Sequence, residues 1–117
     1  MHELSIATAI VDLACEEAAA RSVRVRAVYL KLGVFSGVVK EALSGSFEIA
    51  AAGTPIEGSR LVIEEVPLVV YCTKCATRRE PTSTQLLECP ECGEPAGEVL
   101  EGRELQVTAL EVEDYAG

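Results

Sequence analysis

The sequence predicts an α+β fold: two helices packed on a small mixed sheet of about three strands, with an inserted four-cysteine zinc-ribbon subdomain. Two segments, 4–20 and 38–52, carry apolar residues at helical spacing. Three further segments, 23–32, 60–71 and 104–112, are rich in the aliphatic and aromatic residues that strands favour. Because a helix with an apolar face must bury it against another layer, we expect both helices to cover one face of the sheet.

Both helical segments are amphipathic. The first places its polar residues on one side of the helical wheel: Ser5, Thr8, Asp12 and Glu16. Apolar residues cover most of the remaining wheel, which indicates a helix packed over a wide face. The second segment carries an apolar stripe: Val39, Leu43, Phe47 and Ala50. Gly53 follows this segment at the place where a glycine commonly ends a helix.

The strand segments set the domain organisation. The first strand ends at Gly33, and Pro67 in the second predicts an edge strand or a bulge, since proline donates no backbone hydrogen bond. A cysteine-rich stretch lies between the second and third strands. We therefore expect a zinc-ribbon subdomain at 71–102 and a second, α+β domain formed by 1–70 and 103–117.

The most specific motif in the chain is C-x2-C…C-x2-C, formed by Cys72, Cys75, Cys89 and Cys92. Each C-x2-C turn directs two thiolates at one point, so two turns make a tetrahedral all-sulfur site that suits Zn(II) or, less often, Fe. The alternatives are two disulfides or a redox-active C-x2-C pair. No export signal precedes the chain and no βαβ pattern surrounds the cysteines, which favours structural zinc. A closed four-ligand site also indicates no hydrolytic role.

The charge balance argues against nucleic-acid binding. Nineteen carboxylates face ten lysines and arginines, for a formal net charge of -9. A zinc ribbon that binds nucleic acid needs a basic surface to meet phosphates, whereas this ribbon carries more acidic than basic residues. An acidic surface is better suited to metal cations or to a basic patch on a partner protein.

The composition also bears on cellular location. No apolar run approaches the ~20 residues that span a membrane, and the chain start lacks the features of an export signal. A fifth, unpaired cysteine, Cys15, fits a reducing compartment. We expect a cytoplasmic protein that makes no contact with a membrane.

The second informative feature is His2, the one histidine in the sequence. The terminal amine, the His2 backbone nitrogen and its imidazole can close two fused chelate rings, which present three nitrogens in one plane. That arrangement suits Ni(II) or Cu(II). Glu3 is next to it and supplies either a carboxylate ligand or a first-turn negative charge for the helix. A frayed terminus without a role is the alternative, which the spacing alone favours.

Several motifs taken together resemble the HypA/HybF family of hydrogenase maturation factors. The resemblance covers the whole chain and is carried by the two cysteine pairs and by these stretches: Met1-His2-Glu3-Leu4-Ser5, Gly33, Ser36-Gly37-Val38, Glu41-Ala42-Leu43, Gly53-Thr54, Ile63-Glu64-Glu65-Val66-Pro67 and Gly102-Arg103-Glu104-Leu105. Proteins of that family are nickel metallochaperones that help to load Ni(II) into NiFe-hydrogenase and, in some organisms, into urease.

The resemblance implies a function for each of these motifs. It implies that Ni(II), a transient cargo, binds the Met1 amine and the His2 backbone and imidazole nitrogens, with Glu3 nearby. It also implies structural Zn(II) on the four cysteines. The partners that it implies are the hydrogenase-maturation GTPase and the NiFe-hydrogenase large subunit. We expect transfer of the ion by ligand exchange, and no enzyme activity.

The chain departs from the family pattern at a few positions. Val34 stands where many members have an acidic residue, Val39 and Lys40 where some have a carboxylate, and no histidine lies near the ribbon. Any contact of those groups is therefore not carried over to this chain, and the zinc site is expected to be all-thiolate. An acidic zinc-ribbon adaptor without nickel transfer is the alternative function, and a redox enzyme is a further one.

Overall fold

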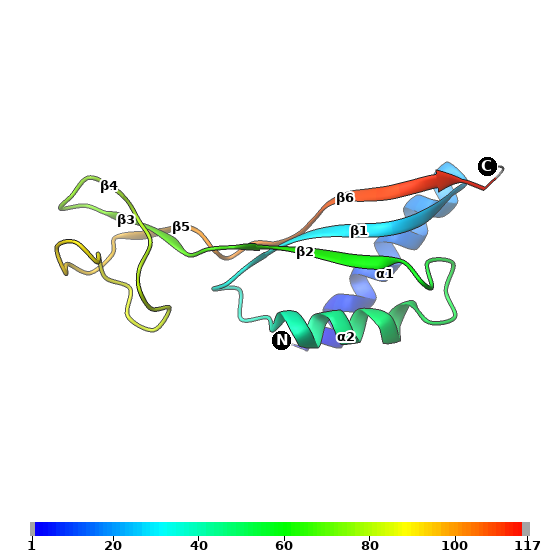
Figure 1. The fold of residues 1–117 in the computed structure, drawn as a ribbon, viewed down its shortest axis with the longest axis horizontal. Coiled ribbons are helices and arrows are strands. Elements are labelled where there is room, and N and C mark those ends of the chain that lie inside the picture. The colour runs from blue at the N-terminus through cyan, green and yellow to red at the C-terminus, as the bar shows by residue number, and fades with distance from the viewer. Residues whose placement is uncertain (1, 116–117) are drawn as a thin grey trace. The chain divides into compact units, whose positions relative to one another are not determined.

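The computed structural model describes residues 2–115 as two helices and six strands (Figure 1). In chain order the elements are α1 (Glu3–Arg21), β1 (Val23–Gly33), α2 (Lys40–Ala51), β2 (Arg60–Val66), β3 (Val69–Cys72), β4 (Thr77–Arg79), β5 (Glu98–Glu101) and β6 (Leu105–Asp114). The described chain divides into two compact units. The sandwich unit comprises 2–31, 37–64 and 106–115, and the ribbon unit comprises 32–36 and 65–105. Within residues 2–115, no helix combines the length and the apolar character needed to cross a lipid bilayer.

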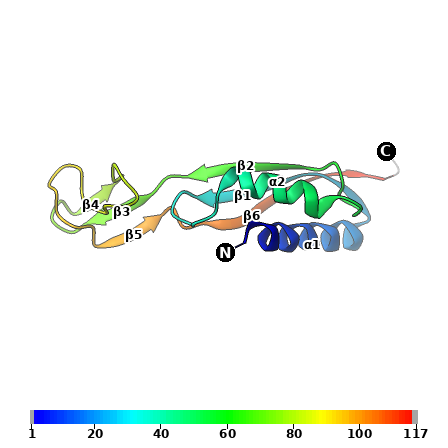
Figure 2. The same ribbon diagram turned by 90° about the horizontal axis from the view of Figure 1, so that it is seen from below.

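The sandwich unit is built on a mixed sheet in the order β2-β1-β6. Figures 1 and 2 show β1 and β2 running in the same direction and β6 in the opposite one. Two hydrogen bonds agree with the parallel pairing. Ser59 Oγ donates to the Val25 carbonyl (2.5 Å) near the start of both strands, and the Val34 N–H donates to the Val66 carbonyl (3.0 Å) at their ends. Because parallel strands need a crossover, α2 connects β1 to β2.

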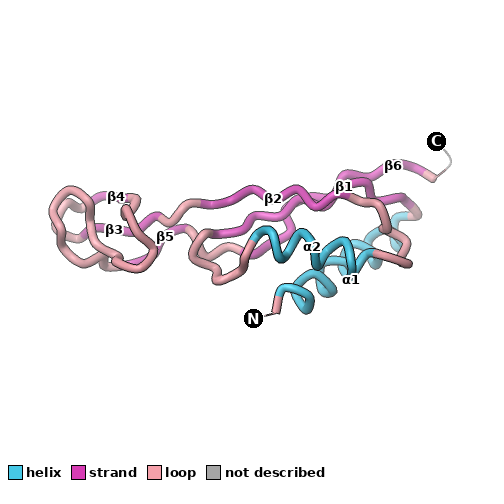
Figure 3. Tube along the Cα trace, turned by 60° about the horizontal axis from the view of Figure 1, so that its bottom comes forward, coloured by secondary structure: helices cyan, strands magenta, loops and turns pink. Residues whose placement is uncertain are grey.

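The apolar core of the sandwich unit lies between the sheet and the two helices, which cover the same face (Figure 3). Phe47 and Leu43 of α2 are among its largest fully buried side chains. A residue of positive φ follows each helix closely: Ser22 follows α1 with φ 54°, and Gly53 closes the end of α2 with φ 77°. The predicted fold class, two helices on a small mixed sheet with a four-cysteine subdomain, is confirmed.

The apolar stripe of the second helix does not include Val39, so that part of the prediction was wrong. Val39 is the N-cap of α2, and 55% of its surface is exposed. Leu43 and Phe47 are buried, and Ala50 is partly buried against the core. The helical spacing of apolar residues continues to Val39, one residue before the helix begins. A cap residue has non-helical backbone, so its side chain does not lie on the helical face.

The segment 60–71 forms two strands where the sequence predicts one. β2 ends at Val66 and β3 begins at Val69, with Pro67 between them. Because proline lacks a backbone N–H, it interrupts a ladder of hydrogen bonds. β3 pairs in a second sheet of order β4-β3-β5, where Val70 lies opposite Arg79 on one side and Val99 on the other. Both partners of β3 are antiparallel to it. The sequence did not predict this second sheet.

The ribbon unit combines two stretches of the chain, 32–36 and 65–105. Residues 32–36 belong to it because they are bonded to the stretch before β6. The Gly33 N–H donates to the Glu104 carbonyl (2.7 Å), and the Phe35 N–H donates to the Gly102 carbonyl (2.7 Å). The Arg103 guanidinium lies over the Phe35 ring, 5.5 Å from its centre. These contacts join segments that are distant in the sequence.

Candidate metal sites

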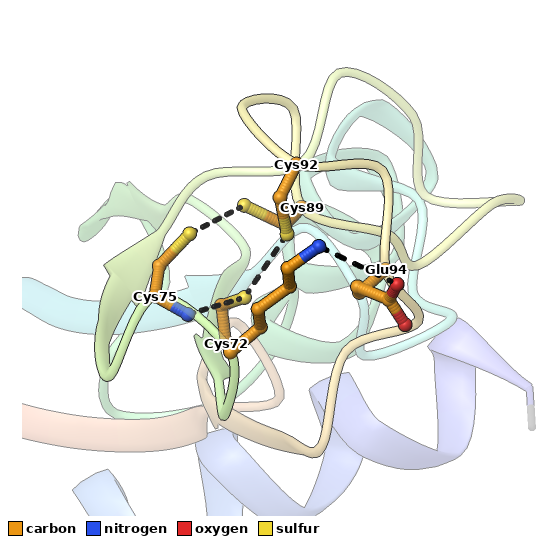
Figure 4. Close-up of polar contacts among 6 residues, drawn as sticks. Cys72, Cys75, Cys89, Cys92 and Glu94 are labelled. Atoms are coloured by element: carbon orange, nitrogen blue, oxygen red, sulfur yellow. Dashed lines mark hydrogen bonds and ion pairs between the residues drawn. The ribbon is translucent and has the colours of Figure 1, made fainter.

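The four predicted cysteine ligands come together in the ribbon unit (Figure 4). Their sulfur atoms all lie within 4.8 Å of one another. The Sγ atoms of Cys72 and Cys92 are 3.5 Å apart, and those of Cys75 and Cys89 are 3.9 Å apart. A tetrahedron with Zn–S bonds of about 2.3 Å has edges of about 3.8 Å. The sulfur positions therefore match the dimensions of a zinc site, and all four are free thiols.

Local backbone geometry directs the sulfurs inward. At the first pair, the Cys75 N–H donates to Cys72 Sγ (3.4 Å), as expected of a turn that presents two sulfurs to one ion. At the second pair, the Gly93 N–H donates to the Cys89 carbonyl (2.8 Å) with φ 77° at Gly93. A side chain at that φ would be strained, which explains why glycine follows the pair. Cys72 and Cys89 are buried, whereas Cys75 and Cys92 are partly exposed.

Two of the thiols, those of Cys89 and Cys92, have pKa values shifted in opposite directions. Burial raises the pKa of Cys89, but backbone hydrogen bonds from Cys92 and Glu91 and the Arg79 side chain outweigh it and lower that pKa to about 6. At Cys92 the backbone hydrogen bond from Glu94 lowers the pKa, but burial and the neighbouring thiols raise it to about 12. A second thiolate beside the first needs a compensating cation. Binding of a metal ion by these thiols would release protons.

His2 and Glu3 lie in the sandwich unit. Met1 falls outside the described residues, so its predicted amine ligand has no position here. His2 is exposed and is the N-cap of α1, with extended backbone (φ -83°, ψ 124°) and no side-chain capping hydrogen bond. Its carbonyl accepts the N–H groups of Ser5 (3.1 Å) and Ile6 (3.3 Å), which anchors it to the first turn of the helix. The imidazole is therefore held close to the chain start and is not engaged in capping.

Glu3 makes a contact that the sequence did not predict. Its Oε2 accepts the backbone N–H of Val39, the N-cap of α2, at 3.2 Å. This backbone hydrogen bond is the main cause of the lowered pKa of the Glu3 carboxyl. The Glu3 carboxylate thus connects the first residue of α1 to the N-cap of α2, and a negative charge is favourable at that end of a helix. No local sequence signal indicates this pairing, because the two residues lie 36 positions apart in the chain.

Replacing Glu3 by alanine is expected to lower the thermal midpoint of the protein by a few degrees, because the Val39 N–H loses its acceptor. The folded pKa of Glu3 is lower than the unfolded one, so the contribution is present above the ordinary glutamate pKa. It is lost as the pH falls through the folded pKa. Thermal unfolding followed by circular dichroism at neutral and acidic pH measures this. Glu16→Ala, on the same helix, is the control, and equal midpoints for both variants would contradict the prediction.

Comparisons with known proteins match nearly the whole chain. The sequence profile of the family described as "Hydrogenase/urease nickel incorporation, metallochaperone, hypA" matches residues 1–112. The hydrogenase maturation factor HypA of Chloroflexus aurantiacus is 50% identical over 112 residues, which cover 95% of this chain and 98% of that protein. The factor of the same name from Streptomyces avermitilis is 44% identical, over 97% of this chain and 88% of that protein.

Two solved structures share the fold. A solution structure of HypA protein superimposes with a TM-score of 0.71 and covers 97% of each chain. The Ni metallochaperone HypA from Helicobacter pylori superimposes with a TM-score of 0.65 and covers 97% of this chain and 99% of that one. Both are 21% identical to this chain in sequence, so this likeness shows a common architecture.

Proposed function

Because the chain belongs to the HypA family of nickel-incorporation metallochaperones, we propose that it binds Ni(II) at Met1, His2 and Glu3 and delivers the ion during maturation of NiFe-hydrogenase. The observation that carries this proposal is the state of His2. Its imidazole is exposed beside the chain start and makes no capping hydrogen bond. With Met1 as the first residue, the amine, the His2 amide nitrogen and the imidazole form the planar nitrogen set that Ni(II) favours.

Because His2 is at the start of α1, coordination of a metal ion by its amide nitrogen breaks no hydrogen bond of the helix. An N-cap residue donates no hydrogen bond to the helix ladder, so its N–H can be replaced by a metal without breaking a helical bond. The carbonyl of His2, by contrast, accepts two helical N–H groups and holds the residue in place. His2 therefore has an anchored carbonyl and an imidazole that the helix does not use.

Glu3 has a supporting role in this proposal. Its carboxylate is occupied by the Val39 N–H, so it orients the chain start on α2 in the form that the structure shows. It lies one residue from the proposed nitrogen ligands and keeps a negative charge close to the ion. Three nitrogen donors would leave one of the four positions of a square-planar ion open. An incoming ligand from a partner can bind there before the first donors leave, which suits transfer of a cargo ion.

We further propose that the four cysteines hold structural Zn(II), since their sulfur separations fit a tetrahedral site. Bound there, the ion supplies a crosslink between the turn after β3 and the turn before β5. Four protein ligands saturate the site, so it supports folding and not hydrolysis. In this proposal residues 71–102 form the zinc-ribbon subdomain, and 1–70 with 103–117 form the nickel-binding domain.

The proposed setting is the cytoplasm, where the maturation GTPase and the NiFe-hydrogenase large subunit are the expected partners. Urease is a second proposed recipient of the nickel, in keeping with the family description. The acidic surface, with a net charge of -9, favours association with basic protein patches over nucleic acid. The proposed role is that of a carrier, which agrees with a family of metallochaperones.

Titration calorimetry with Ni(II) tests the nickel site. The zinc-loaded, tag-free protein is compared with His2→Ala and with a variant that carries Gly-Ser before Met1. We expect either change to weaken nickel binding by at least about 100-fold, because the first removes the imidazole and the second moves the amine away from it. Ser5→Ala, at an exposed position of α1, is the control and should bind as the parent does. Equal affinity in all four proteins would exclude the proposed donor set and favour an adaptor role.

A further inference from the structure

Arg79 differs from the other cationic residues of the ribbon unit in the groups that surround its guanidinium. Its Nε atom is buried and has no hydrogen-bond partner among the described residues. Arg79 pairs with Val70, two residues before Cys72 on β3, so its side chain lies on the sheet face that carries the Cys72 thiol. Its guanidinium interacts with the side chains of Cys89 and Cys75. The sequence shows this residue only as one charge among several and gives no sign of the contact. A buried donor without a partner is unfavourable, and a thiolate is a stronger acceptor than a thiol.

The side chains of Arg79 and its neighbour Arg78 point in opposite directions from strand β4. On β4, Arg79 pairs with Val70 and Arg78 pairs with Tyr71 of β3, so the two arginines point to opposite faces of the ribbon sheet. Arg78 forms an ion pair with Glu101 of β5. The two remaining cations are also engaged elsewhere. Lys74 lies 3.9 Å from Glu94, and Arg103 covers a phenyl ring. Within the ribbon unit, Arg79 is therefore the cation directed at the sulfurs.

We propose that Arg79 is a positioning residue of the four-cysteine site, where its guanidinium holds the Cys75 and Cys89 thiolates and offsets the excess negative charge of a bound tetrathiolate zinc centre. Four thiolates exceed the charge of one Zn(II) by two, and the ribbon unit is otherwise rich in glutamate. A cation at hydrogen-bonding reach of two of the sulfurs stabilises this anionic centre. It also draws electron density from the thiolates and fixes their orientation, as groups around metal ligands commonly do.

The fork of the guanidinium suits this position better than a single ammonium group would. Arginine presents several N–H donors in one plane and can serve two sulfurs from one side chain. A lysine there would retain the charge but would satisfy fewer acceptors. This inference rests on the proposed zinc site and is independent of nickel delivery. Replacement by lysine therefore separates the effect of charge from the effect of directed donors.

The experiment compares Arg79→Gln, Arg79→Lys and Arg78→Gln in the full chain. Chelator competition measures the apparent Zn(II) affinity, and the absorption spectrum of the Co(II)-substituted protein reports the thiolate donors. We expect Arg79→Gln to weaken zinc binding by about 10- to 100-fold. Its sulfur-to-cobalt charge-transfer band should shift to lower energy, because the thiolates lose a hydrogen-bond donor. Arg79→Lys should recover part of the affinity. Arg78→Gln removes the same charge from the adjacent residue and should leave affinity and band unchanged.

The outcomes distinguish the inference from the zinc site on which it rests. If Arg79→Gln and Arg78→Gln weakened zinc binding equally, or neither did, Arg79 would have no specific role and the inference would be wrong. If Arg79→Gln lost the site altogether, the lysine variant would decide: recovered affinity supports the inference, and an equal loss overturns it. Failure of the parent protein to give a tetrahedral tetrathiolate Co(II) spectrum would instead reject the zinc site itself.

Discussion

Removal of zinc is expected to unfold the ribbon unit while the sandwich unit stays folded. The ribbon unit, residues 32–36 and 65–105, has few buried apolar side chains apart from the two buried cysteines: Leu32, Val66, Leu68, Val69 and Val70. Structural zinc contributes about 10–16 kcal/mol to the folding of small zinc domains. That is comparable with the entire stability of a typical domain, about 5–15 kcal/mol. The described part of the ribbon unit shows no other source of stability on that scale.

The sandwich unit has a core of its own. The cluster that contains Phe47, Leu43 and Ile10 draws its buried members from α1, α2, β1 and the loop after α2, and none comes from the ribbon unit. Hydrogen exchange measured by mass spectrometry before and after chelation tests this expectation. Protection of β3 and β5 amides should be lost, and protection of the two helices should persist. Cys89→Ser should reproduce the chelated state without a chelator. Protection of β3 that survives chelation would contradict the prediction.

Gly33→Ala is expected to destabilise the protein by about 1–3 kcal/mol or more, as overpacking of a closely packed site does. A Cβ atom at Gly33 would lie 2.0 Å from the Gly102 carbonyl oxygen and 2.6 Å from the Arg103 backbone nitrogen. Both obstacles are backbone atoms, so rotation of a side chain relieves neither. The Gly33 N–H donates to the Glu104 carbonyl at 2.7 Å, and this bond must lengthen if the two segments separate.

Urea unfolding measures the effect of this substitution. Gly45→Ala is the matched control: Gly45 lies within α2, and a Cβ atom added there would meet no neighbouring atom within 4 Å outside its own helix backbone. Alanine favours a helix over glycine by about 0.5–1 kcal/mol, so that variant should be slightly stabilised. The same chemical change would then have opposite signs at the two positions. A urea midpoint for Gly33→Ala equal to that of the parent would contradict the prediction, because the segments at Gly33 and Gly102 would then separate with no loss of stability.

Much of the fold follows from local patterns. Apolar residues at helical spacing predicted both helices to within two residues at each end, because a helix must bury a face that recurs every 3.6 residues. The same spacing was less informative about the residues at the ends of a helix. The helical spacing placed Val39 on a buried stripe, although this residue is the exposed N-cap of α2. A periodicity does not show where the helix begins, since the cap residue already has non-helical backbone.

The strands were harder to predict than the helices. The run 60–71 is continuous in its composition, and Pro67 suggested a bulge or an edge. In the structure, Pro67 lies between two strands that belong to different sheets. Which sheet a strand joins depends on partners that are far away in the chain, such as β5 for β3. Composition predicts that a segment is extended, and the partner is decided by tertiary packing.

The sequence alone determined the family of the protein and predicted the four-thiol cluster. The C-x2-C spacing places each pair of thiols on one turn, so this part of the prediction depends on local structure. Only the tertiary structure decided what surrounds the candidate metal ligands: Arg79 beside the sulfurs of Cys75 and Cys89, and the Glu3 carboxylate on the Val39 N–H. The second of these contacts joins residues 36 positions apart in the chain. The path of the folded chain brings them within the few ångströms over which hydrogen bonds and ion pairs act.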